Sequence, residues 1–150
     1  MTNDASDSAE QRDAEPFLIK ALSDDVGVWI EPGSPEGLAA PGVELDGYSR
    51  EQRVLAEAYA RHGKLKPAQR HKIAGDILKM IYVERVLGDT WRKYLCFADE
   101  AAAQSVQGDG WLAQTVRTFG VEVRVCPLPA DVRDAVIAAQ KLQVMVNPSP

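Results

Sequence analysis

The sequence predicts a mixed α/β (α+β) fold, in which one central sheet is flanked by helices. Three short segments with strand-like patterns precede the longest helical pattern, and two strand–helix units follow it. Three consecutive strands favour an antiparallel meander, whereas the later units need crossover connections. The chain has 150 residues and 45% hydrophobic content, which is enough for one domain with its own core. We therefore expect a disordered acidic tail over residues 1–14 and a single domain over residues 15–146.

The first half of the domain is expected to hold a short helix and three strands. The tail before it contains no apolar residue larger than alanine after the first methionine, which is typical of disorder. The helix is predicted over Pro16–Leu22 and the first strand over Val26–Ile30. Residues 43–48 alternate between apolar and polar and predict the second strand, and residues 54–61 predict the third. The short polar segment between them indicates a hairpin.

The longest predicted element is a helix from Pro67 to Leu87. The fixed φ of proline suits the first helical position, and apolar residues recur at helical spacing after it. Gly88 is expected to end the helix. The remaining elements are a strand over Trp91–Ala98, a helix over Asp99–Phe119 with a break near Gly108–Gly110, a strand over Val121–Val125, and a helix over Val132–Leu142 capped by Asp131.

Several function classes are disfavoured by composition. No apolar run approaches the roughly 20 residues needed to cross a bilayer, and the N-terminus lacks the basic-then-apolar order of a signal peptide. We therefore expect a cytoplasmic protein with no membrane partner. Cys96 and Cys126 lie in apolar stretches without metal-ligand spacing, so they are expected to be small buried thiols and not a disulfide or a metal site. The aromatic content of 7% argues against a stacking platform for single strands.

Charge is distributed unevenly along the chain. The net charge of −5 disfavours a nucleic-acid partner at first sight. However, the first 50 residues hold eleven acidic and three basic residues, whereas residues 53–85 hold eight basic and three acidic ones. This basic band is either a surface that contacts phosphates or a solvated helix face.

Two carboxylates are expected to meet on the predicted hairpin. Side chains two residues apart on a strand share a face, so Glu57 shares its face with Leu55 and Tyr59. If the second and third strands pair, Asp46 lies beside Glu57. Like charges placed side by side destabilise a sheet unless something compensates them. A hard divalent cation is the usual compensation, and Mg²⁺ is commonly held by one or two carboxylates with water and substrate phosphate.

Cationic and polar groups follow the second carboxylate directly. At the start of the long helix they form the candidate substrate-binding set, namely Lys64, Lys66, Gln69 and Arg70. Lys72 and Asp76 share a helix face with Gln69, away from the apolar stripe. Carboxylates beside lysines and a helix N-terminus suit metal-assisted hydrolysis of a phosphodiester, because the lysine stabilises developing charge while the metal activates water.

The order helix–strand–strand–strand–helix–strand, with an acid in the second strand and one in the third, resembles the PD-(D/E)XK nuclease superfamily. The stretch 42–47 supplies the first acid, Asp46, and the stretch 54–59 supplies the second, Glu57. The resemblance covers roughly residues 16–125. It implies a restriction-endonuclease-like αβββαβ core with an extra αβα extension. It also implies a Mg²⁺ or Mn²⁺ ion held by Asp46 and Glu57, and a nuclease that acts on DNA in preference to RNA. Because one domain is expected, we also expect a homodimer or another partner to help select the substrate.

The lysine of the family motif is missing from its usual place. Two residues after the second acid, where the family has lysine, this chain has Tyr59. A subset of the family has Gln-x-x-x-Tyr in the next helix, but here Gln69 is followed at that distance by Ile73. Some members carry the lysine on the neighbouring helix, and Lys72 is the first candidate for that position. Lys64 and Lys66 are the next candidates.

Two alternatives to a nuclease remain open at this point. The first is a catalytically decayed module of the same fold, which would bind nucleic acid or a protein partner through the surface of residues 61–79. It is motivated by Tyr59, which stands where the lysine is expected. The second is a small homo-oligomeric protein with no role in nucleic-acid chemistry.

Overall fold

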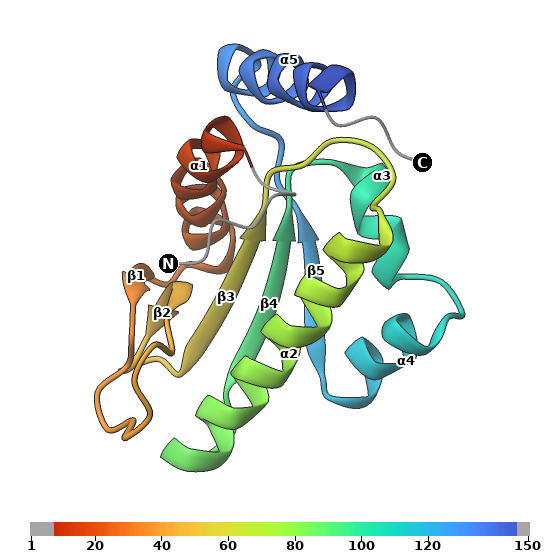
Figure 1. The fold of residues 1–150 in the computed structure, drawn as a ribbon. Coiled ribbons are helices and arrows are strands. Elements are labelled where there is room, and N and C mark those ends of the chain that lie inside the picture. The colour runs from red at the N-terminus through yellow and green to blue at the C-terminus, as the bar shows by residue number, and fades with distance from the viewer. Residues whose placement is uncertain (1–7, 147–150) are drawn as a thin grey trace.

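A computed structural model of the chain describes residues 8–146. A five-stranded sheet lies between helices on its two faces (Figure 1). In chain order the elements are α1 (Ala9–Val26), β1 (Glu31–Gly33), β2 (Leu45–Ser49), β3 (Val54–Tyr59), α2 (Pro67–Leu87), β4 (Arg92–Phe97), α3 (Glu100–Ala103), the 3₁₀ turn η1 (Gln104–Val106), α4 (Trp111–Thr118), β5 (Val121–Val125) and α5 (Ala130–Val146).

The sheet is mixed, as the sequence predicts. Its strand order is β1-β2-β3-β4-β5, with antiparallel pairing of β1 with β2 and of β2 with β3. β3, β4 and β5 run parallel, because α2 carries the chain from β3 to β4 and the segment α3–η1–α4 carries it from β4 to β5. The hairpin predicted between the second and third strands is therefore present.

Each face of the sheet has its own apolar core. One core packs α2, η1 and α4 against the sheet and includes Leu55 and Tyr59 of β3. The other packs α1 and α5 against the opposite face and includes Ala56 and Ala58. Because side chains alternate along a strand, Glu57 points to the α2 face together with Leu55 and Tyr59. This placement agrees with the face predicted for Glu57.

α1 is longer than the sequence predicts. It begins at Ala9, and the Oγ of Ser8 caps it by accepting a hydrogen bond from the backbone N–H of Gln11 at 3.1 Å. The expectation of a disordered tail is therefore wrong for residues 9–14, while residues 1–7 lie outside the described part of the chain. The segment is polar except for small residues, but Ala14 is fully buried against the sheet, so packing overrides the composition.

The first predicted strand, Val26–Ile30, is also wrong. Val26 ends α1, Gly27 follows it in the left-handed conformation with φ of 71°, and β1 starts only at Glu31. Val28 and Ile30 are buried while Trp29 is 75% exposed. The segment that links α1 to β1 therefore alternates between buried and exposed side chains as a strand does, which explains the prediction.

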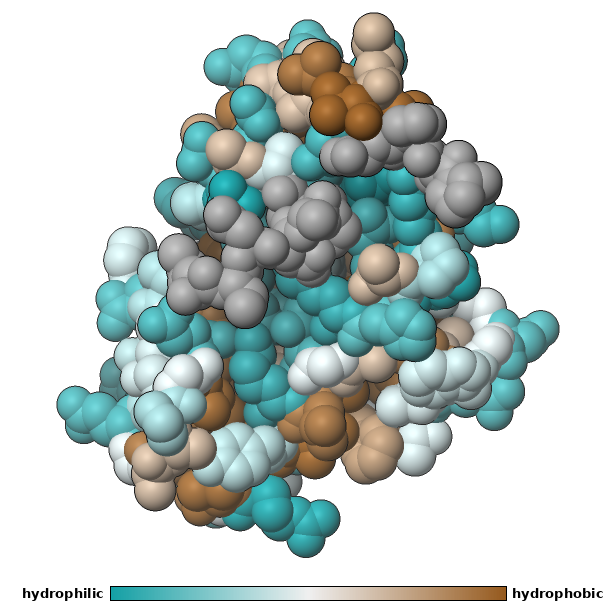
Figure 2. Space-filling model, viewed as in Figure 1, coloured by the Kyte–Doolittle hydropathy of each residue, from teal (hydrophilic) through white to brown (hydrophobic). Residues whose placement is uncertain are grey.

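The remaining elements agree closely with the sequence. α2 has the predicted bounds, and the break predicted near Gly108–Gly110 separates η1 from α4. α5 begins at Ala130, so Asp131 lies in its first turn and is not its cap. No helix among residues 8–146 is long and apolar enough to span a membrane. The last turns of α5 expose apolar side chains, which form the brown group at the top of Figure 2: Leu142, Val144, Met145 and Val146.

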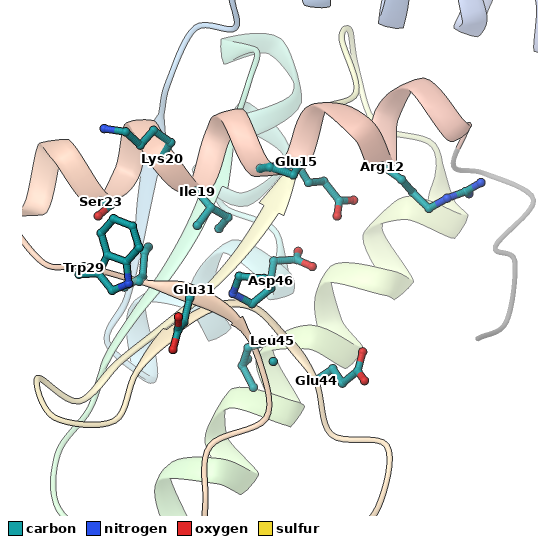
Figure 3. Close-up of a pocket in the computed structure, with 14 residues that line it drawn as sticks. Arg12, Glu15, Ile19, Lys20, Ser23, Trp29, Glu31, Glu44, Leu45 and Asp46 are labelled. Atoms are coloured by element: carbon teal, nitrogen blue, oxygen red, sulfur yellow. The ribbon is translucent and has the colours of Figure 1, made fainter.

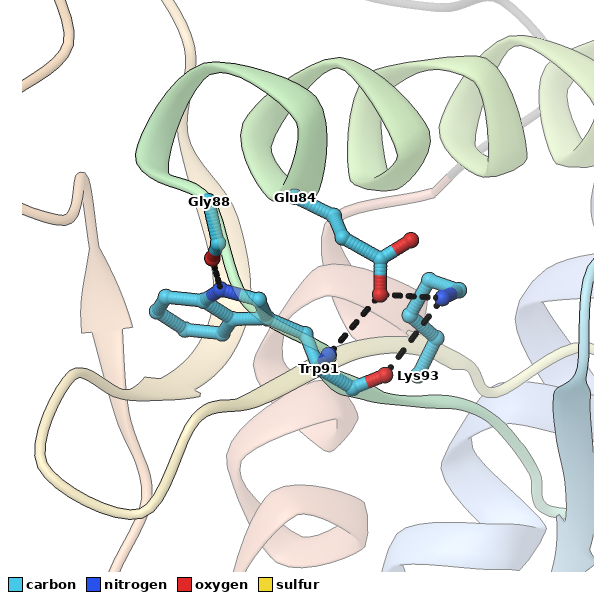
Figure 4. Close-up of polar contacts among 4 residues, drawn as sticks. All are labelled: Glu84, Gly88, Trp91 and Lys93. Carbon is cyan, nitrogen blue, oxygen red and sulfur yellow. Dashed lines mark hydrogen bonds and ion pairs between the residues drawn. The ribbon is translucent and has the colours of Figure 1, made fainter.

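An ion pair ties the end of α2 to β4 (Figure 4). The Lys93 ammonium, only 5% exposed, lies 2.8 Å from Oε2 of Glu84. The same oxygen accepts a hydrogen bond from the backbone N–H of Trp91 at 2.8 Å. Burial opposes ionisation of Glu84, but the hydrogen bond from Lys93 and that from Trp91 together keep its pKa below the ordinary value. The indole N–H of Trp91 donates to the carbonyl of Gly88, which fixes the turn between helix and strand.

Removal of the Glu84 carboxylate should destabilise the fold, because the buried Lys93 ammonium would lose its partner. For Glu84→Ala we expect the free energy of unfolding to fall by about 2 kcal/mol in urea titrations followed by tryptophan fluorescence. For Glu84→Gln, which keeps an acceptor for the Trp91 N–H, the free energy of unfolding should fall by less. Lys20→Ala breaks an exposed pair with Asp24 and should change stability by no more than about 0.5 kcal/mol. Equal effects of the Glu84 and Lys20 variants would contradict this account.

Candidate functional site

Three carboxyl groups and one ammonium group gather where β2, β3 and α2 meet. We name this set the acidic cluster, and its members are Asp46, Glu57, Asp76 and Lys79. In the antiparallel hairpin Gly47 pairs with Ala56, so one residue further from the turn Asp46 lies opposite Glu57. Oδ2 of Asp46 accepts a hydrogen bond from the backbone N–H of Ala58 at 2.8 Å, which holds the Asp46 carboxylate against β3. The two acids predicted to meet therefore lie side by side.

Glu57 is the most deeply buried acid of the cluster. It is 3% exposed, and the Nζ of Lys79 lies 2.6 Å from its Oε1, close enough for an ion pair but without the angle of a hydrogen bond. Burial raises the pKa of Glu57 to about 10, with further increases from the charges of Asp46 and Asp76 and from a hydrogen bond with the Asp46 carboxyl. Lys79 opposes this increase only in part. Glu57 therefore holds a proton at neutral pH unless a stronger cation reaches it.

Tyr59 connects the cluster to the core. Its ring stacks on Phe97 with 5.0 Å between the centroids, and its hydroxyl donates a hydrogen bond to Oδ2 of Asp76 at 2.8 Å. Burial and the neighbouring Asp76 raise the pKa of Tyr59 well above its ordinary value, so the hydroxyl stays neutral and remains a donor. Tyr59, which stands where the PD-(D/E)XK motif has lysine, therefore orients Asp76 in this chain.

The cation of the cluster comes from α2 and is Lys79. Its Nζ lies 2.6 Å from Glu57 and 3.5 Å from Oδ1 of Asp76. Burial lowers the pKa of Lys79, but the charges of Glu57 and Asp76 outweigh burial and raise it, so the ammonium keeps its proton. Lys72, the candidate chosen from the sequence, lies two helical turns earlier on the same face. Burial raises the pKa of Asp76, and the charge of Lys79, the hydrogen bond from Tyr59 and the charge of Lys72 act to lower it.

The predicted substrate-binding residues divide into two groups. Lys64 and Arg70 are exposed around the first turn of α2. Lys66 is the N-cap residue of α2, and Gln69 is buried, where its Oε1 accepts a hydrogen bond from the Lys66 backbone N–H at 2.6 Å. Gln69 therefore caps the helix, and its role in binding a substrate stays a prediction.

A cavity of about 390 Å³ lies beside Asp46, between α1 and the β1–β2 edge. Figure 3 shows Glu15 and Ile19 of α1 above Glu31, Leu45 and Asp46 of the strand side. Asp46 thus belongs both to the acidic cluster and to the wall of an open cavity. In the view of Figure 2, the surface between α1 and α2 is mainly hydrophilic.

Sequence reasoning found the two strand acids but not the roles of Asp76 and Lys79. A usable signal was present, because Asp76 and Lys79 are three residues apart and Lys79 follows Lys72 by seven. That spacing puts all three on one helix face. The sequence does not encode the direction in which α2 crosses β3. That direction decides which turn of α2 lies above Glu57.

In chemical terms, the cluster offers hard oxygen donors and one ammonium group within a short distance. Among residues 8–146 no group of three or more histidine, cysteine, aspartate or glutamate side chains is arranged to hold a metal ion. Asp46 and Glu57 remain a two-carboxylate pair of the kind that holds Mg²⁺ together with water and substrate oxygens.

Replacing Glu57 with glutamine should stabilise the metal-free protein at alkaline pH. The pKa of Glu57 is raised to about 10 in the folded state, so the free energy of unfolding falls as pH rises from about 4.5 towards that value. Glu57→Gln removes this dependence, and we expect a gain of about 1–2 kcal/mol near pH 8 that shrinks towards pH 5. Thermal and urea unfolding with a chelator would measure it. Glu51→Gln, at an exposed site, is the control. A variant that is less stable than the wild type at pH 8 would contradict the prediction.

Comparisons with protein-family models, with curated proteins and with solved structures found no match for this chain. The geometry of the acidic cluster is therefore the basis on which a function is proposed.

Proposed function

We propose that this protein is a metal-dependent nuclease of the PD-(D/E)XK type, which hydrolyses phosphodiester bonds in nucleic acid. The observation that carries the proposal is the pairing of Asp46 and Glu57 on one hairpin, with Glu57 buried and a lysine against it. Two carboxyls so placed repel each other when both are ionised, and a divalent cation relieves the repulsion directly. DNA is the favoured substrate.

The arrangement of elements supports the same proposal. α1 is followed by three strands, then by α2 and β4, which is the order expected from the resemblance. The two acids lie on the second and third of these strands, in the antiparallel part of the sheet. α2 crosses the same face and supplies the lysine that β3 lacks.

The donor set fits a hard cation. Asp46 and Glu57 would provide carboxylate oxygens, and Asp76, held by Tyr59, adds negative charge nearby without completing a three-carboxylate group. Mg²⁺ or Mn²⁺ bound there would polarise the phosphate and activate water. Before a metal binds, Glu57 holds a proton and the Lys79 ammonium lies against it, so a metal ion would have to displace both.

Lys79 is proposed as the cation that acts on the substrate, in preference to Lys72. Its ammonium is three-quarters buried beside Glu57, where an electrostatic interaction is stronger than in water. When Glu57 is engaged elsewhere, the ammonium is free to stabilise charge that develops on a phosphate oxygen. Lys64 and Arg70, exposed at the start of α2, are proposed to contact the nucleic-acid backbone.

One observation favours the non-catalytic alternative. Tyr59 stands at the lysine position and forms a hydrogen bond to Asp76, while Lys79 already lies 2.6 Å from Glu57 in the absence of metal. A decayed module would retain this arrangement as a fixed structural unit and bind nucleic acid or a protein through the basic surface of residues 61–79. Such binding would weaken steeply with salt and would lead to no cleavage.

Loss of the Asp46 carboxylate should abolish both metal binding and cleavage. We expect calorimetric titration with Mg²⁺ or Mn²⁺ to show a millimolar or tighter site in the wild type that is absent in Asp46→Ala and in Glu57→Ala. Cleavage of a mixed set of DNA and RNA oligonucleotides should fall in both variants by at least about 100-fold. Glu51→Ala is the matched control, because it removes an exposed acid from the turn of the same hairpin.

The outcomes separate the two functions. Cleavage that persists in Asp46→Ala and Glu57→Ala would refute the assignment of the site. Salt-sensitive binding of oligonucleotides without metal uptake or turnover would refute the nuclease and support the non-catalytic module. An unchanged gel mobility of DNA and RNA at low salt would refute both.

The two lysines of α2 should differ in their effects. Lys79→Met removes the competitor for Glu57, so we expect metal to bind at least as tightly as in the wild type while cleavage at saturating metal falls about 100-fold or more. Lys72→Met should lower cleavage less than about 10-fold. Calorimetry and single-turnover cleavage measure the two effects separately. The reverse order of the two losses would return the catalytic role to Lys72.

A further inference from the structure

Two thiols far apart in the sequence lie together on the face of the sheet opposite the acidic cluster. Cys96 is in β4, and Cys126 follows the last residue of β5. In the parallel register Cys96 pairs with Arg124, so Cys126 lies two residues beyond that partner on the same face. The backbone N–H of Cys126 donates to the carbonyl of Phe97 at 2.8 Å, which keeps Cys126 beside β4 after the strand has ended. Both side chains belong to the same buried cluster on this face of the sheet.

The thiols differ in access to solvent. Cys96 is fully buried beneath α1, where its Sγ lies 3.7 Å from the carbonyl oxygen of Leu18. Cys126 is 7% exposed and lines an open pocket of about 760 Å³, whose wall also includes Asp25, Tyr94 and Arg124. A small oxidant can therefore reach Cys126 from the pocket, whereas Cys96 has no exposed surface.

The thiols also differ in acidity. The neighbouring Cys96 thiol lowers the pKa of Cys126, and the Arg124 guanidinium acts in the same direction against burial and the charge of Asp25. The neighbouring Cys126 thiol, together with burial, raises the pKa of Cys96. The thiol beside the pocket is thus the more readily ionised of the two, which is the order needed when a thiolate attacks and a neutral thiol resolves.

We propose that Cys126 and Cys96 form a redox-sensitive modification site, in which Cys126 reacts with a peroxide and Cys96 then closes a disulfide between the ends of β4 and β5. Both cysteines are free in the structure. They are the only cysteines of the chain, so any disulfide within one molecule is this one. The sulfur atoms must approach to about 2 Å, and the loop that begins at Pro127 gives Cys126 the freedom to move.

The reaction balances with one hydroperoxide for each disulfide. The Cys126 thiolate attacks an oxygen of hydrogen peroxide, the O–O bond breaks, and a sulfenic acid and hydroxide result. The Cys96 thiol then attacks the sulfenic sulfur. The S–S bond forms, the S–O bond breaks, and the oxygen leaves as water after it takes a proton. Overall, two thiols lose two electrons and two protons, and one peroxide molecule is reduced to two molecules of water.

Treatment of the folded protein with stoichiometric hydrogen peroxide tests this site. We expect intact-mass measurement to show the loss of two hydrogen atoms in the monomer, and denaturing alkylation to find both thiols blocked until dithiothreitol is added. Peptide mapping should identify one cross-link between the peptides of Cys96 and Cys126. Free cysteine in the same tube serves as the control for the oxidant. If it is oxidised while both protein thiols can still be alkylated, the proposal is overturned. A cross-link that forms only between molecules would overturn it as well.

Single variants test the order of the two steps. In Cys96→Ser the sulfenic acid on Cys126 has no resolving thiol, so dimedone should trap it. In Cys126→Ser, the buried Cys96 should resist peroxide. Circular dichroism checks that both variants fold. Where either does not, limited alkylation of the folded wild type with iodoacetamide provides the same information, because Cys126 should be labelled well before Cys96. Equal labelling of the two cysteines, or faster labelling of Cys96, would overturn the assigned order.

Discussion

The repulsion between two neighbouring acids is the constraint on which the rest of the site depends. The β2–β3 hairpin places the Asp46 and Glu57 carboxyls side by side, and Glu57 is buried, so little water screens its charge from that of Asp46. Three features reduce this repulsion. A proton is retained on Glu57, Lys79 approaches from α2, and a backbone N–H of β3 binds Asp46. Each of these requires a specific register between hairpin and helix, so the position of α2 and the hairpin are not independent features.

The hairpin is in turn held by a close contact with α1. Gly47 stands between Asp46 and the turn, and a Cβ at this position would lie 3.1 Å from two carbon atoms of Ile19. Only glycine allows α1 to approach β2 this closely without displacing the Ile19 side chain. The same approach forms one wall of the cavity beside Asp46. The helix whose beginning, residues 9–14, the sequence analysis assigned to a disordered tail is therefore part of the support for the candidate site.

The parts of the fold that were predictable are those in which local pattern and tertiary packing agree. α2 has proline at its start, glycine after its end and an apolar stripe between them, and its bounds were predicted to the residue. The Asp46–Glu57 pairing followed from a period of two on both strands. The beginning of α1 was not predictable, because alanine, glutamate and glutamine are common in both helices and disordered segments, and only burial of Ala14 distinguishes them. The choice between Lys72 and Lys79 depended on the angle of α2 across β3, which no local pattern encodes.

The energetics of Glu57 argue for a function and against a purely structural cluster. A buried carboxylate that neighbours two other acids and needs a lysine for compensation is less stable than an apolar side chain of the same size would be. Tyr59 and Phe97 show that the adjacent part of the same core is packed by stacked rings, so nothing in the fold requires a charge at position 57. Local destabilisation of this kind is typical of sites whose chemistry needs the charged groups. A divalent cation would replace both the retained proton and the ammonium group on Glu57 with a single stronger interaction. Lys79 would then be released within reach of whatever the cation binds.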